Sequence, residues 1–548
     1  MNLRSLAVLL TLGVFGGTAF AQYTSSNRDI LTPNTGTWNA TGVTLNGLNF
    51  VNLGLQGVGR IAASTTDPVT GESIGSISDM QINDWTRTTG GSYTGTFNFL
   101  PDRGYNAGST FSNYAARINT FSFTFTPYTS PSTTTAQNQI QTTYTGTQRF
   151  TYDHDNNVAT SPIYTTGLLA NGSTIQFGGQ PIPTVTQATS NPLEGNTPIT
   201  DRLTLDTEGL AFDPRAGRSG SGWVSDEYGA NIYHFNSSKQ IDGILAIPKA
   251  LVPHSPTGTV NFNVDPPIDG RRINQGFEGL AVNHDGTRLY TLLQSATIQD
   301  SGSGNQGRTN TRLLVYDTSS ENAPTDPIAQ YVIQLPRVDS DGGGTVDRTA
   351  AQSSIIAISD TQFLILSRDG NGRGASGSPV FKSILLADIS KATNIDGLYD
   401  FEGAAVAPGG VLAANVTPLE WTEALNLLSK LDLGVTELEQ FGLNLNTAPG
   451  DINSLSEKWE GLSLVSANDP AAPNDYFLFM GNDNDFLTSS GSMLDANGNP
   501  FTYNAGLEND TMLLAFRVQI VPEPGVTALL AIGSLAFFGR RRARCLRL

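Results

Sequence analysis

Short apolar runs separated by Gly, Asn, Asp, Ser and Thr recur along most of the chain. Residues 117–126 alternate polar and apolar positions and predict a half-exposed strand, and 289–293 and 355–358 predict further strands, the second more buried. The chain has 58 glycines among 548 residues, so turns are frequent. This texture favours an all-β fold over a mixed α/β one.

A Glu-Gly pair followed by small or apolar residues opens several of the strand-like runs. There are four copies, which begin at Glu208, Glu278, Glu402 and Glu460. After most copies a second β-rich run ends in charge, at 226–227, 368–369 and 483–485. Such recurrence indicates a cyclic array of similar sheets with carboxylates pointing toward a shared axis. A structural role for these pairs stays open, because Glu could tie a sheet to its neighbour and Gly permits close backbone approach.

Two segments depart from the β pattern. The stretch 417–420, Thr-Pro-Leu-Glu, supplies an N-cap hydroxyl, a first-turn proline and a glutamate three residues after the cap. Leucines follow at helical spacing, so we predict a short helical insertion at 417–441. Residues 22–49, rich in Thr, Asn and Gly, are expected to form an exposed N-terminal segment with little core content.

The two ends of the chain carry targeting patterns. Arg4, the apolar stretch 6–15 and the small residues at 19–21 predict a signal peptide over 1–21. At the other end, Pro-Glu-Pro at 522–524 leads into an apolar stretch, 525–538, and an arginine cluster, 540–544. The apolar stretch is short for a stable span of about 20 residues, but its basic flank follows the positive-inside preference.

The three-part order of residues 521–548 resembles the PEP-CTERM sorting signal of Gram-negative bacteria. The resemblance implies transient insertion of a short transmembrane helix into the inner membrane and removal by an exosortase-type enzyme. A permanent anchor is the alternative. Either way, we expect the folded part at the cell surface or outside the cell.

Charge and cysteine use narrow the function classes. The formal net charge is −18, and the body lacks the clustered cations that a nucleic-acid partner requires, so such a partner is excluded. The single cysteine, Cys545, lies in the tail, and the four histidines show no paired zinc spacing. No Gly-x-Ser-x-Gly elbow with suitable partners occurs, which disfavours a serine esterase. The acidic loop 339–347 resembles a calcium loop but has Ala350 where an EF-hand has Glu, so it is not an EF-hand, and an irregular calcium-binding turn stays open.

Several ordered motifs together resemble one family. They are 100–104 (Leu-Pro-Asp-Arg-Gly), 206–211 with 223–229, 274–281 with 289–294, and 458–462 with 482–486. These residues are similar to the phytase-like domain of bacterial "esterase-like activity of phytase" proteins, over about residues 50–518. The resemblance implies a β-propeller, for which we expect six blades, with its ligand site at one mouth of the central channel. The chain departs from the family at Glu402-Gly-Ala-Ala and at Ser367, which precedes Arg368.

The strand-end residues suit phosphate-ester hydrolysis, in which calcium takes oxygen ligands and planar guanidinium groups bind phosphate. The predicted calcium ligands are Asp102, Asp226, Asp369, Asp483 and Asp485. The predicted catalytic residues are Arg103, Arg368 and Glu227. The predicted substrate-binding residues are Glu208, Glu278, Gln294 and Glu460. Each acidic residue could instead cap a turn at a strand end.

Two function classes remain. In the first, the chain is an exported hydrolase that uses calcium to cleave a small phosphorylated substrate. In the second, it is a non-catalytic propeller of the extracellular matrix that binds polysaccharide or protein.

Overall fold

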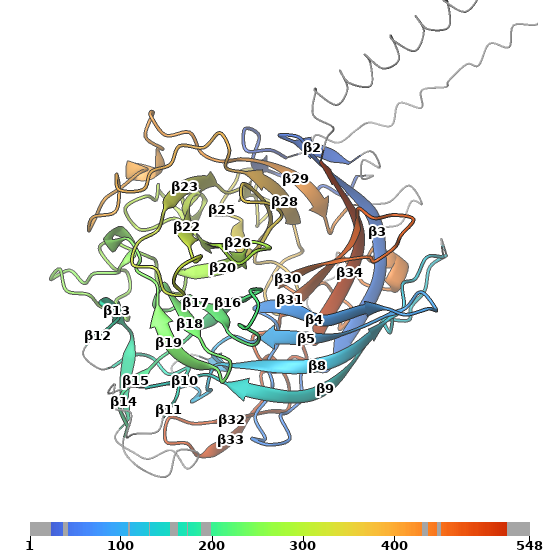
Figure 1. Cartoon of the computed structure of the whole chain (residues 1–548), viewed down its shortest axis with the longest axis horizontal. Coiled ribbons are helices and arrows are strands. Elements are labelled where there is room, and N and C mark those ends of the chain that lie inside the picture. The colour runs from blue at the N-terminus through green and yellow to red at the C-terminus, as the bar shows by residue number, and fades with distance from the viewer. Residues whose placement is uncertain are drawn as a thin grey trace, which may run out of the picture.

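The computed structural model describes residues 23–36, 42–107, 110–130, 132–153, 163–171, 174–187, 199–429, 437–445 and 451–522. In these residues, sheets of four or more strands are arranged around a centre (Figure 1). Five such sheets occur in the described part of the chain, and we number them as blades 1 to 5. The fold is all-β, as predicted.

The first four strands of each blade are antiparallel, and each blade is described outward from its innermost strand. Blade 1 contains β4 (Asp79–Arg87), β5 (Tyr93–Leu100), β8 (Arg117–Phe125) and β9 (Ile140–Arg149). Blade 2 contains β16 (Thr207–Phe212), β17 (Gly222–Asp226), β18 (Asn231–Phe235) and β19 (Gln240–Ile244), extended by β10 (Thr151–Tyr152), which pairs parallel with β19, and β11 (Ile163–Tyr164). Blade 3 contains β20 (Phe277–Val282), β21 (Arg288–Leu293), β22 (Asn310–Asp317) and β23 (Ala329–Gln334). Blade 4 contains β26 (Ala351–Ala357), β27 (Gln362–Arg368), β28 (Lys382–Asp388) and β29 (Glu420–Asn426). Blade 5 contains β30 (Lys458–Ser466), β31 (Asp475–Asp483), β34 (Thr511–Pro522), β3 (Leu48–Ile61) and β2 (Val43–Leu45).

Smaller elements connect and flank the blades. The small sheets are β1 (Asp29–Ile30) with β24 (Arg337–Val338) and β25 (Arg348–Thr349), β6 (Asn106–Ala107) with β7 (Thr110–Phe111), β12 (Ile175–Phe177) with β13 (Gln180–Ile182), β14 (Thr184–Gln187) with β15 (Ile199–Leu203), and β32 (Gly491–Leu494) with β33 (Pro500–Tyr503). The described 3₁₀ turns are η2 (Lys249–Leu251), η3 (Asn305–Gly307), η4 (Pro408–Gly410) and η5 (Glu439–Phe441).

The innermost strands close into a ring. β4 contacts β16, β16 contacts β20, β20 contacts β26, β26 contacts β30, and β30 contacts β4 again. A separate hydrophobic core fills each of the five junctions between neighbouring blades. For example, Phe97 and Phe123 of blade 1 stack with ring centroids 3.8 Å apart and pack on Phe479 of blade 5. The propeller is therefore confirmed, but the expected six blades are not, because the described residues form a ring of five.

Blade 5 joins the two ends of the described chain. β3 pairs antiparallel with β34, so that Leu48 lies opposite Pro522 and Ile61 opposite Thr511. This pairing closes the ring with main-chain hydrogen bonds as well as side-chain packing. The segment 22–49 is accordingly not simply exposed, because Ile30 and Val43 are buried in the cores.

The predicted helical insertion is wrong for its first half. Residues 420–426 form β29, which pairs with β28 along its whole length. The main-chain N–H of Leu419 donates to the carbonyl of Val332, which fixes the approach to this strand. Pairing and burial on both faces, with Trp421 in one core and Leu425 in another, override the local capping pattern. η5 is the one helical turn described between 417 and 441, and residues 430–436 lie outside the described part.

Within the described residues, no helix is both long and apolar enough to cross a membrane. The predicted signal peptide, residues 1–21, lies outside the described part, as does the sorting tail beyond Pro522.

Candidate functional site

The site is formed where the innermost strand of each blade begins and its second strand ends. Because these strands are antiparallel, both ends lie at the same mouth of the ring. A register shift occurs near the start of β16, β20, β26 and β30. Such a bulge re-aims a side chain. In three of these strands the bulged residue is the glutamate of a Glu-Gly pair, namely Glu208, Glu278 and Glu460.

The fourth Glu-Gly pair is not equivalent. Glu402 is exposed and lies in the loop between β28 and β29, with its carboxylate 3.8 Å from Nε2 of His254. The place of the bulged glutamate in blade 4 is taken by Ser353 of β26. The expectation of four repeated glutamates is therefore wrong for Glu402, because a two-residue motif also occurs by chance in a loop.

The glycines of the three true pairs allow neighbouring blades to approach. A Cβ on Gly209 would lie 2.5 Å from Cβ of Leu280 in blade 3, and one on Gly461 would lie 2.2 Å from a methyl carbon of Ile77. Any side chain there would force the blades apart. The glycines of the three pairs thus have a structural role, because they let neighbouring blades pack closely. The glutamates of the same pairs lie at the mouth of the ring.

The three glutamates form the first of three linked acidic groups. Carboxylate oxygens of Glu208, Glu278 and Glu460 all lie within 4.8 Å of one another, and the three residues are buried. Burial, and then repulsion from neighbouring carboxylates, raises the pKa of Glu208 and of Glu278 well above the usual value. Gln294 donates a hydrogen bond to Glu278, and Arg368 donates one to Glu460. Oε2 of Glu278 has no hydrogen-bond partner in the described residues.

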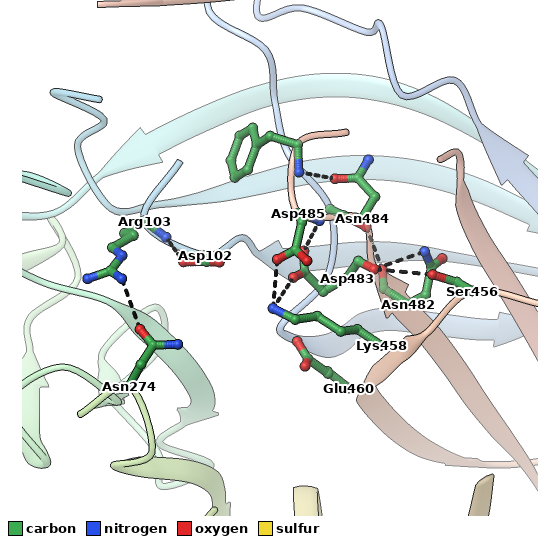
Figure 2. A network of polar contacts seen from close by, with 12 residues as sticks. Asp102, Arg103, Asn274, Ser456, Lys458, Glu460, Asn482, Asp483, Asn484 and Asp485 are labelled. Carbon is green, nitrogen blue, oxygen red and sulfur yellow. Dashed lines mark hydrogen bonds and ion pairs between the residues drawn. The ribbon is translucent and has the colours of Figure 1, made fainter. Parts of the chain in front are cut away.

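The second group contains Asp102, Asp206 and Glu208. Nε of Arg103 lies 3.3 Å from Oδ2 of Asp206, and its Nη2 donates to Oδ1 of Asn274 at 2.9 Å. Figure 2 shows Arg103 turned toward Asn274, beside Asp102. Burial and the adjacent Asp206 raise the pKa of Asp102 well above its usual value.

The third group contains Asp102, Asp483 and Asp485. Nζ of Lys458 lies 3.2 Å from Asp483 and 2.6 Å from Asp485, and Figure 2 shows the lysine pointing at both. Burial raises the pKa of Asp483 well above its usual value. At Asp485 burial is the largest single influence and raises the pKa, but Lys458, a hydrogen bond with Asp483 and the charge of Arg368 together lower it. Since Asp102 and Glu208 are each shared between two groups, the groups form one chain. We call its seven members the mouth carboxylates: Asp102, Asp206, Glu208, Glu278, Glu460, Asp483 and Asp485.

Glu227 lies beside this chain, immediately after β17. It is 3% exposed, and its Oε1 has no hydrogen-bond partner in the described part of the protein. Burial raises the pKa of Glu227 to about 7, with Asp102 adding to the shift and Lys458 and Arg103 opposing it. A buried, poorly solvated carboxyl of this kind can accept a proton near neutral pH.

Two predicted calcium ligands lie outside the acidic groups. Asp226 accepts main-chain hydrogen bonds from Asp206, Tyr228 and Gly229. Asp369 accepts them from Asn371, Val380 and Phe381, and it forms an ion pair with buried Lys382 at 2.9 Å. Both carboxylates are occupied by the turns that follow β17 and β27. These contacts favour a turn-capping role for both residues over the predicted role as calcium ligands.

Sequence reasoning missed two charged residues of the mouth. Asp206 and Lys458 each stand two residues before a Glu-Gly glutamate. Alternate strand residues share a face, so this spacing was a usable signal. It also missed Asp79, at the start of β4, which accepts N–H groups from Met80 and from Leu210 of blade 2, both at 2.8 Å. Burial raises the pKa of Asp79 to about 8.

This chain is similar in sequence to one known protein family and to a secreted relative. Residues 74–486 match the phytase-like family, described as esterase-like activity of phytase. An uncharacterized secreted protein of Arthroderma benhamiae is 30% identical over 480 residues, which cover 80% of this chain and 88% of that protein.

Solved structures give only distant likenesses. The Dos1 propeller has a TM-score of 0.24 at 8% identity, over 84% of this chain and 94% of that one. The PQQ-bound aldose sugar dehydrogenase of Streptomyces coelicolor has a TM-score of 0.23 at 10% identity, over 87% of this chain and 100% of that one. Scores this low carry no argument about the site. The family match and the relative suffice, and the chain belongs to the phytase-like family.

Proposed function

We propose that this protein is an exported hydrolase of phosphate esters that uses calcium at the mouth of its propeller. The observation that carries the proposal is the chain of seven mouth carboxylates, which are contacted directly by only three cationic side chains, those of Arg103, Arg368 and Lys458, in the described residues. Buried like charges at this separation must be protonated or neutralised by a cation.

The donor set suits calcium. The three linked groups contain only carboxylates, with no His or Cys, and calcium prefers carboxylate oxygens. The unpartnered Oε2 of Glu278 supports ligand binding there. Candidate ligands are the mouth carboxylates, above all the groups around Asp102 and Glu208. When bound, calcium would supply charge neutralisation for a phosphate and a water with a lowered pKa.

The protein's own residues have distinct roles in this proposal. Arg103 and Arg368 bind phosphate oxygens through their planar guanidinium groups. Glu227 accepts a proton from the attacking water, and Gln294 orients Glu278, to which it donates a hydrogen bond. The family description, esterase-like activity of phytase, supports hydrolysis.

The test is phosphomonoester hydrolysis by the purified full chain, with calcium and with chelator. We expect turnover that requires calcium, and a loss of about 100-fold in kcat/KM for Arg103→Met. Arg87→Met is the matched control, because Arg87 ends β4 at the opposite face of the ring. A folded protein without turnover of any phosphoester at any calcium concentration would instead support the matrix propeller that binds polysaccharide or protein.

The same proposal includes export and processing. The fungal relative is described as secreted, which supports an extracellular place for this chain. We propose that the signal peptide is removed and that residues 521–548 act as a PEP-CTERM signal, cleaved at the inner membrane of a Gram-negative bacterium by an exosortase-type enzyme. Intact-mass measurement of the native protein tests this, and retention of the arginine cluster 540–544 would identify a permanent anchor.

A further inference from the structure

A small pocket of about 150 Å³ opens between blades 3 and 4, next to the mouth carboxylates. Its charged lining consists of three arginines, Arg308, Arg348 and Arg368, and no Asp or Glu of the described residues lines it, although the 55%-exposed side chain of Arg348 lies 3.7 Å from Asp347 outside the lining. Polar groups of Gln275 and Ser295 complete one wall, where Ser295 Oγ donates to Gln275 Oε1 at 2.9 Å. The chain as a whole carries 49 acidic and 31 basic side chains. A pocket whose charged lining residues are all basic is therefore unlike the rest of the protein.

Two arginines stand out here: Arg308, which lines the pocket, and Arg272, which lies outside the lining but forms a β-bridge with the lining residue Gln275. Nε of Arg308 and Nε of Arg272 are buried without a hydrogen-bond partner, and neither residue forms an ion pair in the described part of the chain. By contrast, Arg312 pairs with Asp300 at 2.9 Å, and Arg117 pairs with Glu72 at 2.7 Å. The side chains of Arg308 and Arg272 are partly exposed, but a buried N–H without an acceptor is costly.

The arginines also repel one another. Burial lowers the pKa of Arg272 to about 10, and Arg308 contributes to this lowering. Burial and then Arg348 lower the pKa of Arg308. An anion between these side chains would remove the repulsion and supply the missing hydrogen-bond acceptors.

One side chain, that of Arg368, contacts both the pocket and the mouth carboxylates. Arg368 lines the pocket, and its Nη2 donates to Glu460, one of the mouth carboxylates. An anion bound in the pocket would therefore lie one residue away from the candidate calcium ligands. The forks of several guanidinium groups match the tetrahedral oxygens of phosphate.

We propose that Arg308 and Arg348, which line the pocket, and Arg272, whose charge lies beside Arg308, form a phosphate-binding subsite beside the mouth. It rests on the proposed function for its biological ligand, which is either a second phosphate group of the substrate or the phosphate released by hydrolysis. The binding itself needs neither calcium nor turnover.

Direct binding of inorganic phosphate to the full chain tests the subsite. Isothermal titration in chelator avoids calcium phosphate and separates this proposal from catalysis. We expect the wild type to bind phosphate, and Arg308→Gln and Arg272→Gln each to weaken it about tenfold or more. Arg308→Lys keeps the charge without the fork and should have an intermediate affinity, while Arg87→Gln should bind as the wild type does. Melting curves for each variant confirm that it is folded.

The outcomes separate the two proposals. Phosphate binding that depends on Arg308 and Arg272 supports the subsite even if no ester is hydrolysed. Absent binding, or binding unchanged by both folded variants, overturns it even if the enzyme is active.

Kinetics identify the source of the phosphate. If the subsite binds a second substrate phosphate, Arg308→Gln raises KM for a substrate with two phosphate groups and leaves KM for a monophosphate unchanged. If it binds the product, the variant instead relieves inhibition by inorganic phosphate with both substrates.

Discussion

The acidic residues near the ends of the second strands fall into two groups with different surroundings: those that cap turns and those that belong to the mouth carboxylates. Asp226 and Asp369 accept main-chain N–H groups of their own turns, and Asp369 also binds Lys382. The mouth carboxylates, in contrast, lie within 4.8 Å of other carboxylates, although Asp102 and Asp483 each also accept one main-chain N–H of their own turn. Asp226 and Glu227 are adjacent in sequence, yet they fall on different sides of this division. An acidic residue at a strand end therefore has a structural role when main-chain N–H groups surround it. It is a candidate calcium ligand when other carboxylates surround it.

The largest expected effect concerns the turns. Asp369→Ala should lower the free energy of unfolding by about 3–5 kcal/mol, because it leaves Lys382 buried without its counter-charge. Urea denaturation measures this, and the loss should be the same in calcium and in chelator. A loss of unfolding free energy that appears only in calcium would show that Asp369 is a metal ligand. It would contradict the division between turn-capping acids and mouth carboxylates.

The next effect is the pH dependence of the mouth. A carboxyl whose pKa is higher in the folded than in the unfolded chain binds more protons when folded, so stability falls as pH rises between the two values. The pKa values of Asp102, Glu208 and Glu278 are raised well above normal, and that of Glu227 is raised to about 7. Outside the mouth carboxylates, burial raises the pKa of Asp79 to about 8 and that of Asp226 to about 7, and both add to the same slope. In chelator, stability should therefore be greatest near pH 4 and fall toward pH 8, by at most about 1.4 kcal/mol per pH unit for each group.

Denaturation at several pH values in chelator measures this slope. Glu208→Gln should flatten it, because the amide does not ionise. Stability that rises from pH 5 to pH 8 would show that cations of the protein already neutralise the mouth.

Calcium should act only on the mouth. At a concentration of about 100 times Kd, it should add about 2.7 kcal/mol to the free energy of unfolding. Asp483→Asn and Glu208→Gln should reduce this gain, whereas Asp226→Asn should lower the starting stability and keep the gain. Thermal melting with and without calcium checks all three, and an equal loss of the gain in Asp226→Asn would erase the division between turns and mouth.

The smallest effect is expected at the rim. The side chain of Asp485 is 33% exposed and pairs with Lys458. Because partly exposed ion pairs contribute little, Asp485→Asn should change stability in chelator by less than about 1 kcal/mol. The same variant should weaken the calcium response, and a large loss in chelator would make Asp485 a structural residue.

The sequence predicts the class of fold and most of the mouth because both depend on local patterns. The ends of second strands marked five sites, near Asp102, Asp226, Gln294, Arg368 and Asp483, and the structure brings these strand ends to one mouth of the ring. A shift of one residue separates Asp226 from Glu227, and only the turn geometry decides between them. The helix predicted at 417–441 failed because the edge of β28 pairs with residues 420–426.

Other features depend on long-range geometry. The number of blades is determined by which sheets pack against each other around the ring. The number of motifs in the sequence does not predict it. Arg308 and Arg348 come from separate loops around blades 3 and 4, and their spacing in sequence carries no sign of a shared pocket.

The closure of blade 5 also fixes an orientation. β30 begins at the mouth, β31 returns to it, and β34 therefore starts there and ends, at Pro522, on the opposite face of the ring. A protein held at a bilayer by residues beyond Pro522 would turn its mouth away from the lipid and toward the surrounding medium. Diffusing solutes would then reach the carboxylates without passing between the protein and the membrane.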